Sequence, residues 1–276
     1  MLFSCGQYQL SLSRPLIMGV LNVTPDSFSD GGHFFDRKQA LSHARTMIAE
    51  GADIIDIGGE STRPGAPPVT LEEERRRVLP VLEALAGCGV PLSVDTNKPA
   101  LMREAMAVGA SMINDVNGFD APSALEAVAE TRAAICIMHK QGAPRTMQQN
   151  PTYSDVLAEV SAYLQERVSV ALAMGIAQSR ILIDPGFGFG KTLAHNIELL
   201  RHLHVFGKIG VPLLAGLSRK AMLGTITGRE PAQRVHASAA AALLAVQNGA
   251  GIVRVHDVAA TRDVLLVWQA VSNSED

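Results

Sequence analysis

Eight short apolar runs, each followed by a segment with helical periodicity, constrain the fold of this chain more than any other feature of its sequence. Continuous apolar runs are typical of parallel strands buried on both faces, and the intervening amphipathic segments supply the helices that cover them. The strands are predicted at 15–24, 53–59, 91–96, 112–116, 133–139, 180–184, 211–218 and 250–256. The helices are predicted at 36–50, 70–86, 98–108, 121–130, 153–174, 191–204, 231–248 and 257–271.

The number of strand–helix units favours a closed barrel. A (β/α)8, or TIM, barrel typically takes about 250 residues, and this chain has 276. An open doubly wound sheet is the alternative, although such sheets usually have fewer strands. No repeat, low-complexity segment or linker divides the chain, so we expect one domain over residues 1–276.

Composition excludes several classes of function. The formal net charge of -3 gives no electrostatic footprint for nucleic acid. Cys5, Cys88 and Cys136 are scattered and odd in number, which argues against a disulfide framework and against a cysteine zinc site. The longest alanine-rich run, 237–246, is too short to span a bilayer. We therefore expect a cytoplasmic protein with no nucleic-acid or membrane partner.

The stretch DPGFGFGKT, residues 184–192, has the look of a nucleotide-binding loop, but its spacing argues against one. A P-loop requires glycine five residues before Gly190, where Pro185 stands. A dinucleotide fingerprint requires a third glycine and an acidic residue beyond the loop, whereas Asp184 precedes it. We interpret the stretch as a strand end and a flexible turn, with Lys191 starting a helix on the solvent face.

Polar residues gather at the ends of the predicted strands, where a parallel barrel carries its active site. They are Asn22, Asp56, Ser61, Thr62, Arg63, Asp95, Asn114, Asp115, His139, Asp184, Ser218, Arg219, Lys220, Arg254 and His256. Asp95 could instead cap a helix, and Asn114 and Asp115 could form turns. Asp56 and Glu60 are interpreted as facing the interior or a structural partner.

The polar residues fall into two chemical groups. Asp95, Asn114, Asp184 and Lys220 suit a flat heterocycle, because paired carboxylates form strong, orienting hydrogen bonds with adjacent ring N–H groups. Asn22, Arg63, Arg254 and His256 suit phosphate, which arginine grips with two N–H groups. One ligand that carries both a heterocycle and a diphosphate would satisfy both groups.

The motifs in these regions resemble the signature blocks of the bacterial dihydropteroate synthase family over nearly the whole chain. The blocks are MGVLNVTPDSFSDGG (18–32), DIIDIGGESTRPGA (53–66), VDT (94–96), INDV (113–116), MHKQGAPRTMQ (138–148), DPGFGFGKT (184–192), GLSRKAMLG (216–224) and RVHDV (254–258). The resemblance implies a TIM-barrel transferase that joins 4-aminobenzoate to (7,8-dihydropterin-6-yl)methyl diphosphate. The products are 7,8-dihydropteroate, for folate biosynthesis, and pyrophosphate.

The resemblance also implies a set of site residues. It implies a pterin site at Asp95, Asn114, Met138, Asp184 and Lys220, a diphosphate site at Asn22, Arg254 and His256 with Mg²⁺ at Asn22, and an aminobenzoate site at Thr62, Arg63, Phe189 and Ser218, with Gly216 also among the substrate-binding residues. Among these, the expected catalytic residues are Asn22, Arg63, Lys220, Arg254 and His256. The family further implies a homodimer and sulfonamides as ligands of the aminobenzoate pocket.

We expect a dissociative displacement without a covalent enzyme intermediate, because an electron-rich pterin can stabilise a cationic methylene. The loops 24–34 and 61–69 are candidates to close over the second substrate. Three alternatives are a pterin-binding methyltransferase domain, a catalytically silent pterin-binding barrel and a sugar-phosphate barrel enzyme. Release of pyrophosphate from the two substrates would separate the first two from a synthase.

Overall fold

The computed structural model describes residues 1–24, 32–61, 66, 68–142 and 146–272, and in these ranges eight parallel strands form one sheet. The strands are β3 (Leu16–Asn22), β4 (Ile54–Gly58), β5 (Leu92–Asp95), β6 (Met112–Asp115), β7 (Ala134–Met138), β8 (Ile181–Asp184), β9 (Leu214–Ala215) and β10 (Ile252–Val255). Their order in the sheet is β8-β7-β6-β5-β4-β3-β10-β9. Every one of these strands lies inside a predicted run, so the prediction of eight strands is confirmed.

The sheet curves until its two edge strands meet. Ile183 and Leu213 form a parallel bridge, and the N–H of Ile183 donates to the carbonyl of Pro212 at 3.0 Å. This contact makes the fold a nearly closed barrel and excludes the open doubly wound alternative. The predicted strand at 211–218 shrinks to the two residues of β9, and Pro212 contributes to this because it has no N–H to donate to a neighbour.

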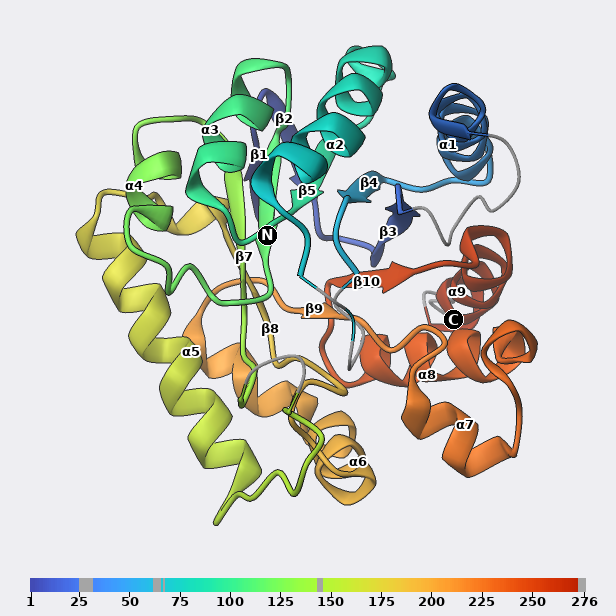
Figure 1. Ribbon diagram of the computed structural model, residues 1–276. Helices are drawn as coiled ribbons and strands as arrows, with labels where there is room; N and C mark the ends of the chain where they lie inside the picture. The colour runs from blue at the N-terminus through green and yellow to red at the C-terminus, as the bar shows by residue number, and fades with distance from the viewer. Residues whose placement is uncertain (25–31, 62–65, 67, 143–145, 273–276) are drawn as a thin grey trace.

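Helices surround the strands on the outside of the barrel (Figure 1). They are α1 (Gly32–Ala49), α2 (Leu71–Leu85), α3 (Pro99–Ala107), α4 (Ala124–Ala129), α5 (Val156–Ala173), α6 (Leu193–Arg201), α7 (Ala221–Thr227), α8 (Val235–Gln247) and α9 (Val258–Ser272). Thr70 caps the start of α2, since its hydroxyl accepts from the N–H of Glu73 at 3.3 Å. The short helix α7 was not predicted.

Apolar residues that alternate along most of the strands belong to two separate clusters. In β4, Ile54 packs in the inner cluster and Ile55 and Ile57 pack in the outer one, beneath the helices. The same alternation places Met112 inside and Ile113 outside on β6. This period of two is the ordinary consequence of strand geometry, and it decides which polar residues face the barrel mouth.

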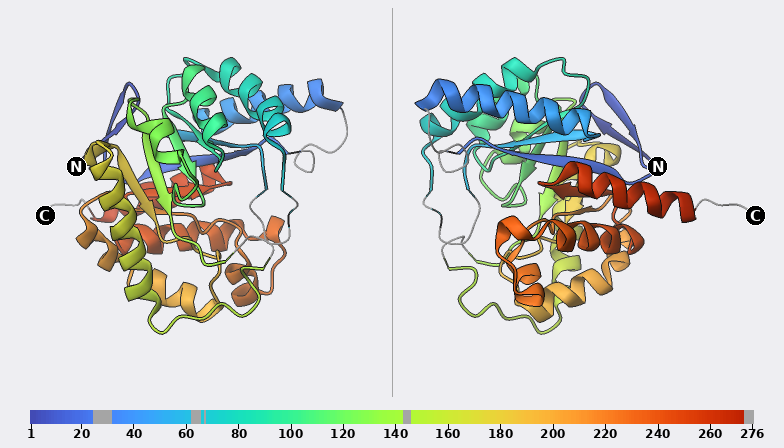
Figure 2. Two further views of the ribbon diagram at one scale, coloured as in Figure 1. Left: turned by 60° about the vertical axis from the view of Figure 1, so that its left-hand side comes forward. Right: turned by 90° about the vertical axis from the view of Figure 1, so that its right-hand side faces the viewer.

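An antiparallel hairpin that the sequence analysis did not predict closes the end of the barrel where the strands begin. It consists of β1 (Leu2–Cys5) and β2 (Tyr8–Ser11) and is seen at the N-terminus in Figure 2. Phe3 and Cys5 are fully buried and pack in the inner cluster with Leu16 and Ile252. Since this end is plugged, the opposite end is the open mouth of the barrel.

Candidate active site at the carboxyl end of the barrel

The side chains of the predicted site residues on the strands point toward the inside of the barrel. They follow residues of the inner cluster by two or four positions: Asn22 follows Met18, Asn114 follows Met112, Met138 follows Cys136, Asp184 follows Leu182, Gly216 follows Leu214 and Arg254 follows Ile252. Side chains two apart on a strand point to the same face. The structure therefore brings these residues together at the rim, as expected.

One row of this rim is fixed by strand register. Asn22 pairs with Gly58, Gly58 with Asp95, and Asp95 with Asn114 across four neighbouring strands. Gly58 keeps this row open, because a Cβ added there would lie 3.7 Å from both Asn22 Oδ1 and Asp95 Cβ. Amide and carboxylate oxygens thus line a gap that any larger residue would narrow.

Arg254 lies at the centre of a buried polar network. Its Nε donates to Asp56 Oδ2 at 2.6 Å, and its Nη2 donates to Asp95 Oδ2 at 2.9 Å. The Nδ2 of Asn114 donates to the same oxygen of Asp56 at 3.1 Å. The two predicted chemical groups are therefore in direct contact, and Asp56 links them.

Burial and charge oppose each other in this network. Burial raises the pKa of Asp95 to about 8, and the nearby Arg254 guanidinium only partly offsets that rise. For Arg254 burial disfavours the charge, but the carboxylates of Asp56 and Asp95 outweigh this and raise its pKa further above the ordinary range. Arg254 is thus a fixed cation whose orientation the side chains of Asp56 and Asp95 determine.

Gly216 lies between the two ends of the predicted site. A Cβ added to Gly216 would lie 3.8 Å from Asp184 Oδ2 and 3.8 Å from the Cβ of Arg254. Asp184 Oδ1 also accepts from the N–H of Gly186 at 2.7 Å. Asp184, predicted to contact a ring, and Arg254, predicted to bind diphosphate, hence open into the same mouth.

Lys220 joins the glycine-rich loop to this mouth. Its Nζ donates to the carbonyl of Phe187 and lies 4.3 Å from the centroid of the Phe189 ring, a cation–π contact. Burial lowers the pKa of Lys220 to about 8, and Asp184 partly opposes this. The ammonium group thus lies over the Phe189 ring and interacts electrostatically with Asp184.

The remaining predicted residues on the described rim lie at the ends of β7, β9 and β10. The backbone N–H of His256 donates to Ser218 Oγ at 3.1 Å, and His256 Nδ1 lies 3.0 Å from the same hydroxyl. Met138 is buried and pairs with Asp184 in register. Thr62 and Arg63, and much of the loops 24–34 and 61–69, lie outside the described residues.

The interpretation of Lys191 as a solvent-facing helix residue is wrong. Its side chain is 2% exposed, and α6 begins two residues later with Thr192 as its cap. Its Nζ lies 3.0 Å from His139 Nδ1 and donates to the carbonyls of Gly186 and Phe189. A glycine-rich turn leaves carbonyls that need donors, and this requirement is the signal that could have located Lys191 from the sequence.

The interpretations of Asp56 and Glu60 are confirmed. Asp56 is fully buried, with the partners given above. Glu60 binds Lys98 and accepts from the N–H of Val69 at 3.3 Å, so its carboxylate joins the residues on either side of the loop 61–68. A lone carboxylate within a run of isoleucines already indicates that Asp56 needs a buried partner.

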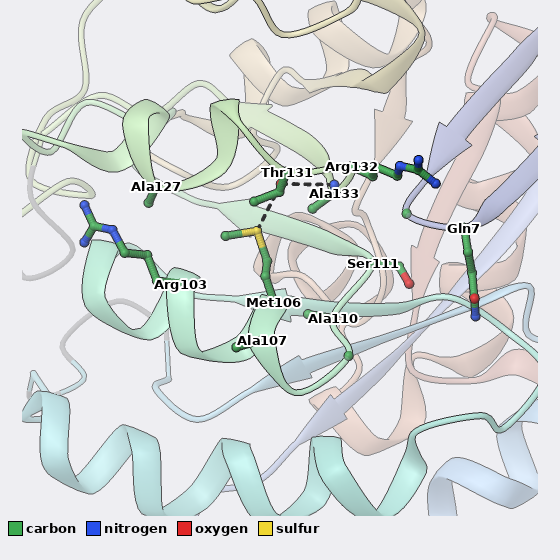
Figure 3. A pocket seen from close by; sticks show the side chains of 12 residues that line it. Gln7, Arg103, Met106, Ala107, Ala110, Ser111, Ala127, Thr131, Arg132 and Ala133 are labelled. Atoms are coloured by element: carbon green, nitrogen blue, oxygen red, sulfur yellow. Dashed lines mark hydrogen bonds between the residues drawn. The ribbon is translucent and has the colours of Figure 1, made fainter.

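A hollow of about 560 Å³ lies away from this rim, beside the hairpin and helices α3 and α4 (Figure 3). Its lining includes Gly6, Met106, Ser111 and Thr131, and none of the predicted site residues. Among the described residues, no cluster of three histidine, cysteine or acidic side chains could hold a metal ion, and no helix is long and apolar enough to cross a membrane.

Comparison with known proteins identifies the class to which this fold and rim correspond. The family model described as pterin binding enzyme matches residues 18–256, so the chain belongs to the pterin-binding enzymes. The match runs from β3 to the end of β10 and thus includes every strand of the barrel.

Within that class the similar proteins are dihydropteroate synthases, and the chain belongs to their family of folate-synthesis transferases. It is 52% identical to the enzyme of Haemophilus influenzae over 268 residues, which cover 96% of this chain and 97% of that protein. The Escherichia coli K12 enzyme is 50% identical over 276 residues, covering 100% and 98%.

Solved structures of the family agree with the fold. The Xanthomonas albilineans dihydropteroate synthase with 4-aminobenzoic acid has a TM-score of 0.94, 54% identity and 99% coverage of both chains. The Burkholderia cenocepacia enzyme complexed with 7,8-dihydropteroate has a TM-score of 0.89 and 50% identity, covering 98% of this chain and 96% of that one.

Proposed function

We propose that the mouth of this barrel holds (7,8-dihydropterin-6-yl)methyl diphosphate by both ends while 4-aminobenzoate displaces the diphosphate, which gives 7,8-dihydropteroate and pyrophosphate. The observation that carries the proposal is the position of Gly216 between Asp184 and Arg254, with 3.8 Å from its missing Cβ to each side. The Asp184 carboxylate and the Cβ of Arg254 thus flank the same glycine, and a ring-binding carboxylate and a phosphate-binding arginine in one mouth suit one molecule with two chemically different ends.

The pterin ring is assigned to Asp95, Asn114, Asp184 and Lys220, with Met138 in the apolar wall. Asp95 and Asp184 are each 7% exposed and accept hydrogen bonds, so ring N–H groups of the ligand would find acceptors already in place. Burial raises the pKa of both carboxyl groups. Arg254 and Lys220 supply the nearby positive charge that favours ionisation.

The diphosphate is assigned to Arg254, His256 and Asn22. Arg254 uses one N–H of Nε and one of Nη2 on Asp56 and Asp95, and no described residue accepts from Nη1. Because guanidinium has five N–H donors, this leaves donors for phosphate oxygens. His256, partly exposed and beside Ser218, would add a further donor.

Mg²⁺ fits this rim only as a partner of the diphosphate. Mg²⁺ prefers oxygen ligands and often binds one or two protein oxygens together with substrate phosphates and water. Asn22 Oδ1 faces the gap left by Gly58 and is the protein oxygen that would hold it. When bound there, the ion would neutralise charge on the departing diphosphate.

The displacement is proposed to be dissociative. The C–O bond between the pterin methylene and the diphosphate breaks, and its electron pair leaves with the diphosphate. Arg254 and His256 stabilise the charge that develops there. The aniline nitrogen of 4-aminobenzoate then forms the C–N bond to the cationic methylene, and its extra proton passes to solvent or to the released diphosphate. Rapid covalent labelling of a side chain by the methylene-pterin would contradict this route.

The aminobenzoate is assigned to Thr62, Arg63, Phe189 and Ser218, and the loops 24–34 and 61–69 to closure over it. Phe189 is partly exposed and lies against Lys220 at the rim, where a second substrate would enter. A Yersinia pestis dihydropteroate synthase structure with a sulfonamide drug is 48% identical to this chain. We therefore propose that sulfonamides compete with aminobenzoate here.

Product formation with and without aminobenzoate tests the proposal. Wild type should release pyrophosphate and form dihydropteroate only when both substrates are present. Asp95→Ala should weaken pterin binding, and Arg254→Ala should lower kcat with less effect on aminobenzoate binding. Pterin binding without pyrophosphate release would favour a methyltransferase or a silent barrel instead.

A homodimer in the cytoplasm is also proposed. Leu244, Leu266, Val267 and Val271 are 47–72% exposed on α8 and α9, two helices that pack against each other. An exposed apolar group of this kind suits an isologous contact with a second copy. Val267→Glu should convert the dimer to a monomer in analytical ultracentrifugation; an unchanged sedimentation coefficient would place the contact elsewhere.

A further inference from the structure

The carbonyls of the glycine-rich loop are all bound by side chains. Gly186 and Phe189 accept from Lys191 at 2.9 and 3.1 Å, and Gly190 accepts from the Tyr153 hydroxyl at 2.9 Å. The other two partners are Lys220 for the carbonyl of Phe187 and Gln148 for that of Gly188. Five successive carbonyls therefore turn toward side-chain donors.

The glycines make this arrangement possible. Gly186, Gly188 and Gly190 have φ values of +70°, +78° and +62°, a region that residues with a Cβ rarely adopt. The resulting turn is neither helix nor strand; the carbonyl of Gly186 accepts from the N–H of Phe189 at 3.1 Å, and the other carbonyls find their donors among side chains. Lys191 meets the largest share of this need, because it binds two of the five carbonyls and each of the other donors binds one.

Among these four donors, only Lys191 belongs to the glycine-rich stretch 184–192 itself. Its ammonium group has three N–H donors, and three acceptors surround it: two loop carbonyls and His139 Nδ1. Burial, followed by the Lys191 charge, lowers the pKa of His139 to about 3, so this imidazole is neutral and its Nδ1 can accept. The lysine is thus satisfied without a carboxylate in direct contact.

The two aromatic residues of the loop depend on Lys191 to different extents. The ring of Phe187 is fully buried in the outer apolar cluster and anchors its own part of the loop. Phe189 is only partly buried, and besides its cation–π contact with Lys220 it is held through its carbonyl by Lys191. Removing the ammonium group should therefore displace Phe189 and leave Phe187 in place.

We propose that Lys191 is a positioning residue that holds Phe189 against the aminobenzoate and so sets the affinity for that substrate. This inference rests on the proposed function, because it takes Phe189 as a wall of the aminobenzoate pocket. Lys191 touches neither substrate in this scheme. Pterin binding should depend on it less, since Asp95 and Asn114 belong to a separate network, while Asp184 and Lys220 contact the loop through Gly186 and Phe187 and not through Lys191.

The test compares Lys191→Met with Phe189→Ala as the reference and Lys208→Met, an exposed lysine, as the matched control. Lys191→Met should raise the KM for aminobenzoate about tenfold or more, since small displacements at a site have large kinetic effects. The pterin dissociation constant, measured by titration without aminobenzoate, should change less than about threefold, because Lys191 does not contact the pterin and misplacement has large effects only on the groups that move. Lys208→Met should behave like wild type in both measurements.

Chemical rescue separates positioning from a general loss of structure. Lys191→Ala lacks the three methylene groups and ammonium that propylammonium would supply, so this ion should lower the raised KM, whereas tetramethylammonium, which has no N–H donor, should not. If Lys191→Met does not fold, the same comparison is made with Lys191→Gln, which keeps one donor group and should show a smaller rise in KM.

The outcomes distinguish the inference from the function on which it rests. If Phe189→Ala raises the aminobenzoate KM and Lys191→Met does not, the inference is overturned and the proposed function stands. If Phe189→Ala has no effect, the assignment of the aminobenzoate wall is wrong, and the inference falls with it. Equal losses for both substrates in Lys191→Met, or equal rescue by both ions, would also overturn it.

Discussion

Asp56 provides the sharpest test of the buried network beneath the diphosphate site. Its Oδ2 accepts from Arg254 Nε at 2.6 Å and from Asn114 Nδ2 at 3.1 Å, while the side chain itself is fully buried. Asp56→Ala removes the acceptor of both donors. Asp56→Asn keeps an acceptor of the same shape but removes the charge.

The expected magnitudes follow from these contacts. Removing one partner of a buried ion pair costs about 3–5 kcal/mol. Because Arg254 keeps its bond to Asp95, we expect the lower end, about 3 kcal/mol of unfolding free energy for Asp56→Ala. A charged hydrogen bond is worth about 1 kcal/mol more than a neutral one, so Asp56→Asn should lose about that amount.

The effect on catalysis should follow the orientation of Arg254. Loss of a preorganised donor at developing charge typically costs about 100-fold or more in rate, which we expect for Asp56→Ala. Asp56→Asn should lose about tenfold, the equivalent of about 1.4 kcal/mol. The assays are kcat/KM for the pterin diphosphate, the inhibition constant of pyrophosphate, and urea unfolding.

Ser93→Ala is the matched control for these variants. Ser93 pairs with Asp56 in register, is fully buried, and its hydroxyl has no hydrogen-bond partner among the described residues. Its loss should therefore change stability and kcat/KM very little. An Asp56→Ala variant within about 1 kcal/mol and threefold of wild type, against the costs expected above, would show that Asp56 does not orient Arg254, and so would an equal loss in Ser93→Ala.

Three further predictions concern stability. The pKa of His139 is lowered from 6.5 to about 3 by burial, so the unfolded chain binds more protons between these values and stability falls as pH drops through this window. In urea titrations His139→Gln should therefore lose less stability than wild type between about pH 6.5 and 4.5. Equal losses would contradict this. Lys98→Met leaves the fully buried carboxylate of Glu74 without its lysine and should cost about 3–5 kcal/mol of unfolding free energy. The double variant Lys98→Met/Glu74→Leu should recover most of this loss. A double variant as unstable as the single one would count against the pairing. Gly186→Ala places a Cβ 1.9 Å from the carbonyl oxygen of His139 and should lower Tm far more than Gly228→Ala. Gly228 has a similar φ of +68° but open space around it, so its substitution costs only the backbone strain of about 1–2 kcal/mol. Similar Tm values would show that the loop can move away.

Local features of the sequence determined the architecture of the barrel and which polar residues of its strands face inward. Each strand is an apolar run, and side chains alternate between the two faces of a strand, so a polar residue two positions after an inward apolar one must face inward as well. Asn114 after Met112 and Asp184 after Leu182 follow this rule. The rule depends only on neighbours along the chain, which is why the rim could be predicted without coordinates.

Tertiary structure alone decided which of those residues are partners and which charges are buried. Arg254 and Asp56 are 198 positions apart, and Lys191 and His139 are 52 apart, so no local pattern pairs them. The hairpin at residues 2–11 is too short to show a strong period, and its role comes from the inner cluster that it seals. Burying a charge is costly unless a partner comes with it, and where that partner lies is settled only when the barrel closes.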